Sequence, residues 1–558
     1  MSSLSILSMK DRKNLLIATS LFCIILIKRL LFLNIGVNWE ESKDLVMIFQ
    51  IANGEVIYRD FYHVYGYLGL YIYTIFFKVF GIFHILFPRL VVSLLFAISA
   101  IFAYKTASRF LTPFWALTAV LIGFSSLGTR EHTYSHIFGF GGAMVALWGG
   151  LSYIHERNIK NLGFAGLACG IAFAAQPLPV GILSTFTLTS LLIYDYLFRD
   201  DIRSPRPYIA FTLTFLLFPS AGVIYFLWNG ALWDYFLTFF PMLLGHENHP
   251  STWFSIPAIF PVDIFYSDSF SQAKAILNKY LVRNLKWWLI TGLFVAGIVY
   301  SVPRLCRERR NSDHLSILFL TGFSMVFEIE RILIYEFNQY TSLFPQFVLL
   351  IYFGIKKSAF NYVRYFVQAM IFFLFLLHFV YTPLIFYAPY KKHGIPLGLK
   401  YAENVMVLPY TREVYREATE FIKSNSSETD KIVVADYKMF FYLFSDRENL
   451  FSENFYIFAE TTFHPFRNEV WLPFKEKLRI EDNIINKIKK KKPALIIIPT
   501  DFLTPENVEQ SPFLTYVVKN WSKCKELGDA RKKTIFDDSY INVTIFCPPE
   551  DQPKFRVQ

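Results

Sequence analysis

The sequence predicts an α-helical polytopic membrane protein with about 11–12 membrane helices and a C-terminal soluble α/β domain. The chain of 558 residues is 54% hydrophobic and only 18% charged, which is too apolar for an ordinary soluble chain of this size. Apolar runs of the length that a bilayer core of ~30 Å requires recur between residues 14 and 385. From about residue 388 the composition changes to a soluble pattern.

The membrane part is divided by its apolar runs. Backbone groups in hydrocarbon must be hydrogen-bonded internally, so each run is predicted to form a helix. The eleven runs are 14–35, 88–106, 111–127, 137–155, 161–177, 179–197, 208–228, 285–303, 314–330, 340–355 and 365–385.

Lysine and arginine residues in the short connections indicate the orientation. Six basic clusters alternate with nearly uncharged connections, and placing all six in the cytoplasm satisfies the positive-inside rule with eleven crossings. The N-terminus is then cytoplasmic, and the C-terminal domain is extracytoplasmic, in the inner or plasma membrane of a cell envelope of bacterial type. The clusters are Lys10/Arg12/Lys13, Lys105/Arg109, Arg157/Lys160, Arg199/Arg203/Arg206, Arg304/Arg307/Arg309/Arg310 and Lys356/Lys357/Arg364.

Residues 67–82 are apolar enough to cross, but a crossing there would move every later basic cluster to the other side. A short re-entrant or interfacial helix is therefore expected at 67–82. The transmembrane module, residues 1–387, then has two long external loops, 36–87 and 229–283. Loops of this length are unusual unless they are functional.

The C-terminal domain, residues 388–558, has alternating helix and strand patterns, which predict a small α/β fold. Of the five cysteines, only Cys524 and Cys547 are candidates for a disulfide, because the other three fall within or beside apolar segments. The predicted helices are 412–424 and 483–490, and the predicted strands are 431–435 and 494–498.

The net charge of +11 is distributed among the connections and forms no basic patch, so nucleic acid is excluded as a partner and the lipid bilayer is expected.

The first external loop is the most informative stretch. Glu40-Glu41 follows the first apolar run, a helical stretch extends to Ala52, and Gly54-Glu55-Val56-Ile57-Tyr58-Arg59-Asp60 precedes an apolar helix opened by Gly66-Tyr67. In order and spacing this resembles the GT-C glycosyltransferases. These are multi-spanning enzymes that use polyprenyl-phosphate sugars, and they include protein O-mannosyltransferases and lipid A aminoarabinose transferases. The chain departs from that pattern with Glu-Glu in place of Asp-Glu and Gly-Tyr in place of Gly-Pro.

The resemblance implies catalytic roles for Glu40 and Glu41, with Glu40 at the position of the family's base. Transfer to a hydroxyl needs a carboxylate that takes the acceptor proton, because a neutral hydroxyl is a weak nucleophile. Arg59 is expected to stabilise the departing phosphate, and Tyr58 and Asp60 to contact the sugar. The structural alternative is that Glu40 and Glu41 only begin a helix, where acidic residues suit the helix dipole.

Further substrate-binding candidates lie at other external helix ends. Arg130, Glu131 and His132 fall between two predicted spans, where charged groups are costly unless they are solvated or functional. Arg331 and Gln339 precede a Phe-Pro helix and are candidates for contact with the lipid phosphate. An interfacial polar turn and a snorkelling arginine are the structural alternatives.

The expected reaction is transfer of a sugar from a polyprenyl-phosphate carrier to a hydroxyl of a glycan, lipid or protein acceptor, with inversion implied by the resemblance. The alternatives are a transporter or flippase of a lipid-linked glycan and a non-catalytic relative. No metal site is predicted, since the pair His246 and His249 lacks a third ligand at recognisable spacing. No cofactor is assigned, and a divalent metal ion stays open.

Overall fold

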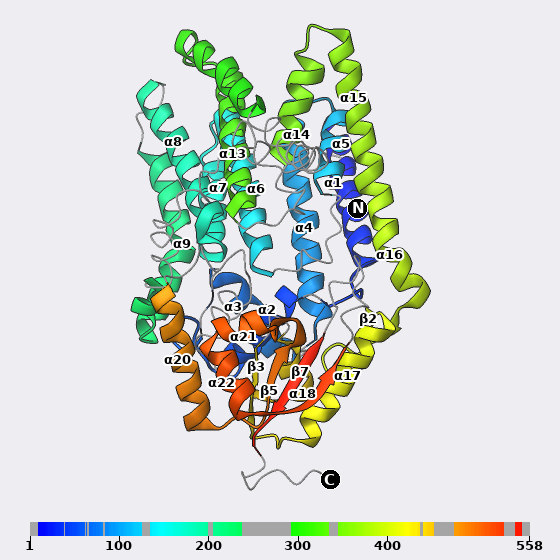
Figure 1. Ribbon diagram of the computed structural model, residues 1–558. Helices are drawn as coiled ribbons and strands as arrows, with labels where there is room; N and C mark the ends of the chain where they lie inside the picture. The colour runs from blue at the N-terminus through cyan, green and yellow to red at the C-terminus, as the bar shows by residue number, and fades with distance from the viewer. Residues whose placement is uncertain are drawn as a thin grey trace, which may run out of the picture.

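The computed structural model describes residues 9–37, 39–61, 63, 66–81, 84–124, 134–198, 205–236, 292–333, 344–435, 439–450, 474–528 and 542–549. In these residues the chain forms a helical bundle with an α/β unit packed on one end (Figure 1). The fold is therefore mostly helical with a small sheet region, as the sequence predicts.

In the part that the structure describes, each of the eleven predicted apolar runs contains a helix. Two of the runs also contain segments of π-helix, η6 (Tyr352–Lys356) and η7 (Leu376–Tyr381), and a third π segment, η2 (Pro177–Gly181), precedes α8. The helices are α1 (Met9–Leu30), α4 (Leu86–Ala107), α5 (Pro113–Gly123), α6 (Tyr134–Glu156), α7 (Ile159–Ala175), α8 (Ile182–Phe198), α9 (Arg206–Trp228), residues 292–307, α13 (Ser312–Leu333), α14 (Phe344–Ile351) and α15 (Asn361–Phe375), the last continuing through η7 into α16 (Thr382–His393).

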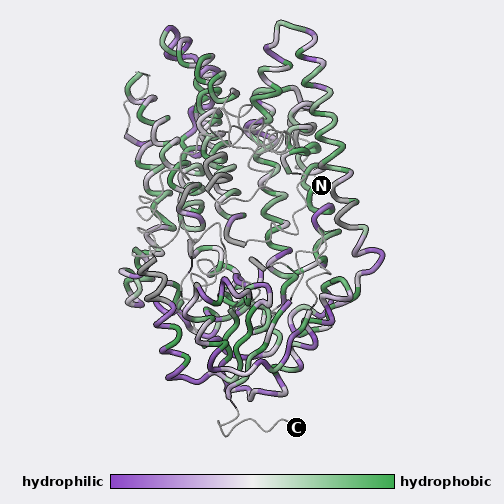
Figure 2. The backbone as a smooth tube through the Cα atoms, viewed as in Figure 1, coloured by the Kyte–Doolittle hydropathy of each residue, from purple (hydrophilic) through white to green (hydrophobic). Residues whose placement is uncertain are grey.

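Hydropathy and burial together indicate a membrane protein. Four helices among the described residues are long and apolar enough to cross a bilayer: Leu86–Ala107, His136–Glu156, Arg206–Trp228 and Asn361–Tyr381. The most apolar stretch of α9 is only 17% buried, and that of Asn361–Tyr381 only 12%. Such apolar outer faces are rare in soluble monomers. Figure 2 shows hydrophobic residues along the helices and hydrophilic ones at the end of the bundle away from the sheet.

The centre of the bundle is packed through small residues. A Cβ on Gly166 of α7 would lie 2.5 Å from the carbonyl oxygen of Phe211, and one on Gly170 would lie 2.4 Å from that of Phe215. These two glycines, four residues apart on one helix face, allow α7 to approach the backbone of α9. Close approach through small residues is a common way for helices to associate in membranes.

Residues from four of the six basic clusters lie at the end of the bundle away from the α/β unit: Arg109, Arg157, Arg309 and Lys356. The helix α4 starts beside that unit, where the Ile85 amide donates to the Tyr401 carbonyl at 3.0 Å. Its 22 residues extend ~33 Å to the opposite end, where Arg109 pairs with Glu156 at 2.7 Å. The same end holds the contacts Arg157–Asp195 (2.6 Å), Tyr194–Arg309 (3.2 Å) and Lys356–Phe110 (2.7 Å).

Two helices of the first predicted external loop, α2 (Trp39–Ala52) and α3 (Leu68–Phe80), lie where the bundle meets the α/β unit (Figure 1). The helix at Glu41–Ala52 is thus confirmed. Met439 of the α/β unit donates its amide to Ser42 Oγ at 2.9 Å, which fixes α2 against that unit. The 13 residues of α3 are about 20 Å long, shorter than a bilayer core. Its interfacial placement stays a prediction.

The α/β unit is built on a five-stranded sheet of order β4-β3-β5-β7-β6. The strand β3 pairs in parallel with both β4 and β5, and β7 runs antiparallel between β5 and β6. The predicted helices and strands are all present, although α16 crosses the predicted boundary at residue 388, so the division into two domains stays a prediction. The elements are β1 (Ile395–Pro396), β2 (Met406–Val407), α17 (Pro409–Ser424), β3 (Lys431–Val434), α18 (Phe440–Ser445), β4 (Glu448–Asn449), α20 (Phe474–Lys491), β5 (Ile496–Pro499), η8 (Thr500–Phe502), α21 (Pro505–Gln510), α22 (Pro512–Asn520), β6 (Ser522–Leu527) and β7 (Val543–Cys547).

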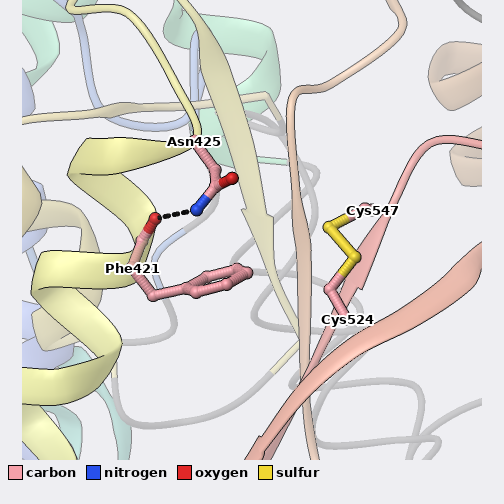
Figure 3. Close-up of a disulfide and its surroundings, with 4 residues drawn as sticks. All are labelled: Phe421, Asn425, Cys524 and Cys547. Atoms are coloured by element: carbon pink, nitrogen blue, oxygen red, sulfur yellow. Dashed lines mark hydrogen bonds between the residues drawn. A yellow bond between two sulfur atoms is a disulfide. The ribbon is translucent and has the colours of Figure 1, made fainter. Parts of the chain in front are cut away.

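A disulfide joins Cys524 of β6 to Cys547 of β7, as the sequence predicts (Figure 3). Beside it, the side chain of Asn425 donates to the carbonyl of Phe421 at 2.8 Å and so caps the end of α17. Both contacts stabilise the side of the sheet that carries α17.

Candidate functional site

Glu41, the second residue of the acidic pair at the start of α2, lies inside the fold. Glu41 is fully buried, and both its oxygens accept hydrogen bonds from Arg89 of α4: Nε donates to Oε1 and Nη2 to Oε2, each at 2.6 Å. Arg89 also donates to the carbonyls of Leu33, at 2.8 Å, and Gly36, at 2.7 Å. This geometry holds the connection between α1 and α2 against α4. The ion pair gives Glu41 a structural role, and the catalytic role predicted for Glu41 stays a prediction.

Glu40 belongs to α2, but the structure describes only its backbone. Helical spacing places Lys43 and Asp44, three and four residues later, on the same face as Glu40. Both are buried, with 1% of Lys43 and none of Asp44 exposed. The predicted base therefore stands one turn before a buried cation and a buried carboxylate.

Lys43 and Asp44 belong to a buried polar cluster with His63, Tyr73 and His136. These five side chains come from α2, the α2–α3 connection, α3 and the start of α6, and none is more than 5% exposed. The charges of Lys43 and His136 act on His63, and the charge of Asp44 acts on Tyr73, which places the groups near one another. Charged groups enclosed in a membrane protein mark a functional site by default.

Burial and neighbouring charges in this cluster disfavour the protonated form of His63. Burial is the largest cause that lowers the pKa of His63 well below its usual value, and the charges of Lys43 and His136 lower it further. Lys43, which lies near His63, is on the face of α2 that carries Glu40.

Arg59 and Asp60 form a second ion pair at a more exposed position. Arg59 Nε donates to Asp60 Oδ1 at 2.9 Å and Nη2 to Oδ2 at 2.7 Å, with 42% of the Arg59 side chain exposed. Asp60 also accepts from the Val56 amide at 2.7 Å, and Arg59 Nη1 donates to the carbonyl of Asn229 after α9 at 3.1 Å. The hydrogen bond from Arg59 is the main cause that lowers the pKa of Asp60. These contacts pin the loop to the end of α9.

Tyr58 supports the same loop. Its backbone has a φ of 73°, which is uncommon for a residue other than glycine. Its ring packs against Phe226 of α9 at 5.3 Å and Tyr235 at 5.1 Å, measured between ring centroids. The structure thus brings Tyr58, Arg59 and Asp60 together at α9, and joins Glu41 to Arg89 of α4.

The other predicted site residues lie beyond what the structure describes. Arg130, Glu131, His132 and Gln339 fall outside the described residues, as does the pair His246 and His249. For Arg331 only the backbone, in α13, is described. Their predicted roles stay predictions. No group of three or more metal-ligating side chains occurs among the residues that are described.

The sequence analysis did not identify Lys43, Asp44, His63, Arg89 and His136 as site residues. A signal existed for Arg89, since a charge inside the apolar run 88–106 is costly without a partner. Helical spacing from Glu40 would have pointed to Lys43 and Asp44. Nothing in the sequence pattern places His63 beside His136, which is 73 residues away by number.

Comparison with models of known families finds no match, and comparison with individual curated proteins finds none either. Among solved structures, the chain is similar to the oligosaccharyltransferase of Archaeoglobus fulgidus tethered with an acceptor peptide, at a TM-score of 0.43, 12% identity, and coverage of 97% of this chain and 75% of that one. The archaeal oligosaccharyltransferase AglB of the same organism, in complex with an inhibitory peptide and a dolichol-phosphate, matches at a TM-score of 0.43 and 13% identity. That match covers 97% of this chain and 75% of the other. A TM-score below 0.5 carries no functional argument.

Proposed function

We propose that this protein is a membrane glycosyltransferase that transfers a sugar from a polyprenyl-phosphate carrier to an acceptor hydroxyl, at the end of the bundle that carries the α/β unit. The observation that supports it is the buried polar cluster, which adjoins Glu40 where an apolar bundle meets a polar unit. A donor whose lipid tail lies in the bilayer would present its phosphate at that depth.

In the proposed reaction, the Glu40 carboxylate accepts the proton of the acceptor hydroxyl as its oxygen forms a bond to the sugar C1. The bond from C1 to the phosphate oxygen breaks, and the lipid phosphate leaves with that electron pair. Lys43 offsets the negative charge that develops on the phosphate, and Asp44 orients the sugar. The family resemblance implies inversion at C1 for such a single displacement.

Glu41 acts as a positioning residue in this proposal, and its effect passes through Arg89. The ion pair fixes the first turn of α2 and so the direction of Glu40, and small displacements of a catalytic group are costly. Tyr58, Arg59, Asp60, Arg130, Glu131, His132, Arg331 and Gln339 remain proposed substrate contacts. For Arg59 this requires exchange of Asp60 for a phosphate group, which the same bidentate donors could bind.

The proposed location is the extracytoplasmic face of an inner or plasma membrane. The disulfide between Cys524 and Cys547 supports it, because disulfides persist in oxidising compartments and are rare in the cytosol. The basic clusters at the opposite end of the bundle support the same orientation.

The test is a glycan profile of cells that lack the protein, complemented with the wild type, Glu40→Gln, Glu40→Asp or Glu413→Gln. Glu413 is exposed on α17 and serves as the matched control. We expect the deletion to accumulate carrier-linked sugar on the outer leaflet and to lose that sugar from one glycan. Glu40→Gln should fail to restore it, Glu40→Asp should restore part, and the control should restore all.

Full activity of Glu40→Gln would remove Glu40 as the base. Accumulation of carrier-linked sugar on the cytoplasmic leaflet would instead identify a flippase, because the donor would then not have crossed the membrane.

A further inference from the structure

A polar cavity of about 580 Å³ lies between α2 and the α/β unit, within the usual size range of ligand sites. Its lining on the bundle side includes Phe49, Gln50 and Asn53 of α2, followed by Glu55. Phe49, Gln50 and Asn53 come nine to thirteen residues after Glu40, which is ~14–20 Å along the helix axis. The cavity therefore adjoins the C-terminal end of α2, whereas Lys43 and Asp44 of the buried polar cluster lie in its first two turns.

The charges around the cavity balance. Four lysine or arginine residues and four aspartate or glutamate residues line it. Several of them pair with one another: Lys400 Nζ lies 2.9 Å from both oxygens of Asp446, and Lys431 Nζ lies 2.8 Å from Glu448. A balanced and largely paired lining gives no net attraction to an anion such as a lipid phosphate.

Glu55 is the group in this lining that has hydrogen-bonding capacity to spare. Its Oε2 is enclosed and accepts no hydrogen bond from the residues that the structure describes. Burial, and then the negative charges of Asp60 and Glu448, raise the pKa of the Glu55 carboxyl. A ligand hydroxyl could donate a hydrogen bond to the enclosed Glu55 oxygen. A bound anion would instead add electrostatic repulsion to the Glu55 carboxylate.

Amide groups stand beside that carboxylate. Asn53 supplies two N–H donors and a carbonyl acceptor. The Gln50 side chain already makes a hydrogen bond to Glu55 and keeps its remaining amide groups for a ligand. The Tyr401 hydroxyl donates to Asp446 at 3.2 Å and can still accept a hydrogen bond. Hydroxyls that both donate and accept would use the carboxylate and the amides together. An apolar lipid chain would satisfy none of these groups.

We infer that the polar cavity binds an uncharged polyhydroxyl ligand, a neutral glycan segment of the acceptor. The inference rests on the proposed transferase function and narrows it, because it selects a glycan from the three acceptor classes. The cavity holds a part of the acceptor remote from the reacting hydroxyl, while Glu40 in the first turn of α2 performs the proton transfer.

The test measures binding by calorimetry to the full-length protein in nanodiscs. The probes are a panel of neutral oligosaccharides that includes maltotriose, cellotriose and mannotriose, with glucose 1-phosphate and an uncharged hexapeptide for comparison. We expect a neutral oligosaccharide to bind and Glu55→Ala to weaken its affinity roughly tenfold, the size of a lost hydrogen bond to a charged group. Gln50→Ala should weaken it less, and Glu413→Ala should leave it unchanged.

The inference is overturned if no neutral oligosaccharide binds, if Glu55→Ala binds as tightly as Glu413→Ala, or if glucose 1-phosphate or the peptide is preferred. Transfer is measured on the same preparations. If sugar transfer depends on Glu40 but no glycan binds, the proposed function stands and the cavity is not a glycan site. If glycan binds but the wild type transfers no sugar, the proposed function is wrong and the cavity remains a glycan site.

Discussion

The two arginine–carboxylate pairs of the first loop have the same chemistry and opposite surroundings. In the Glu41–Arg89 pair neither side chain is exposed, whereas in the Arg59–Asp60 pair 42% and 28% of the side chains are exposed. Each guanidinium makes two hydrogen bonds to its carboxylate. The difference shows that solvent, more than geometry, decides how much the fold depends on an ion pair. A buried charge has no substitute for its partner, and an exposed one has water.

The largest effect is expected from Arg89→Leu. It leaves the Glu41 carboxylate buried without a cation and removes the donors to the carbonyls of Leu33 and Gly36, so it should destabilise the protein by ~3–5 kcal/mol. The matched control is Arg109→Leu just beyond the other end of the same helix, where the pair with Glu156 is partly exposed and solvent can replace the lost partner. It should cost only about 1 kcal/mol, even though Arg109 also donates to Ser152. Thermal unfolding in detergent and the yield of folded protein measure both.

The double variant Glu41→Leu/Arg89→Leu should recover part of the loss, since it removes the uncompensated charge but not the unpaired carbonyls. Equal stability of Arg89→Leu and Arg109→Leu would show that burial does not distinguish the two ends of α4.

A smaller effect on stability is expected from the titration of His63. Because the pKa of His63 is lowered on folding, only the unfolded chain gains this proton near pH 6.5. The contribution to stability is therefore present above pH 6.5 and is lost as the pH falls toward the folded pKa, by at most about 1.4 kcal/mol per pH unit. His63→Gln should flatten the fall in melting temperature between about pH 6.5 and 5. The exposed His393→Gln is the control, and identical slopes for the two variants would refute the assignment.

The contribution of Glu55 to stability should depend on pH in the opposite sense to that of His63. The effect should be smaller, because the Glu55 side chain is only partly buried. Its pKa is raised on folding, so its contribution is present below pH 4.5 and is lost as the pH rises through the folded pKa. Glu55→Gln should therefore raise the melting temperature at neutral pH and reduce the decline above pH 4.5. Glu413→Gln, tested in parallel, should do neither. A lower melting temperature for Glu55→Gln at pH 7 would contradict the raised pKa.

The same comparison shows what the sequence could predict. Helices followed from local hydropathy, and all eleven runs proved helical, because length and apolarity are properties of one segment. The partner of Glu41 was not predicted, because Arg89 lies 48 residues later and only the packing of α4 against α2 brings them together. The Arg59–Asp60 pair involves neighbours in sequence, yet its attachment to Asn229 depends on the position of α9.

The smallest effect on stability is expected from Arg59→Gln, about 0–1 kcal/mol, because the ion pair with Asp60 is exposed to solvent. Asp60→Asn should cost somewhat more, since Asp60 also accepts the Val56 amide and so holds the turn. If Arg59 binds the donor phosphate, Arg59→Gln should raise the KM for a lipid-linked donor while the melting temperature hardly changes. An unchanged KM would assign Arg59 to the loop alone, and its exposed position would then serve only to fasten the first external loop to α9.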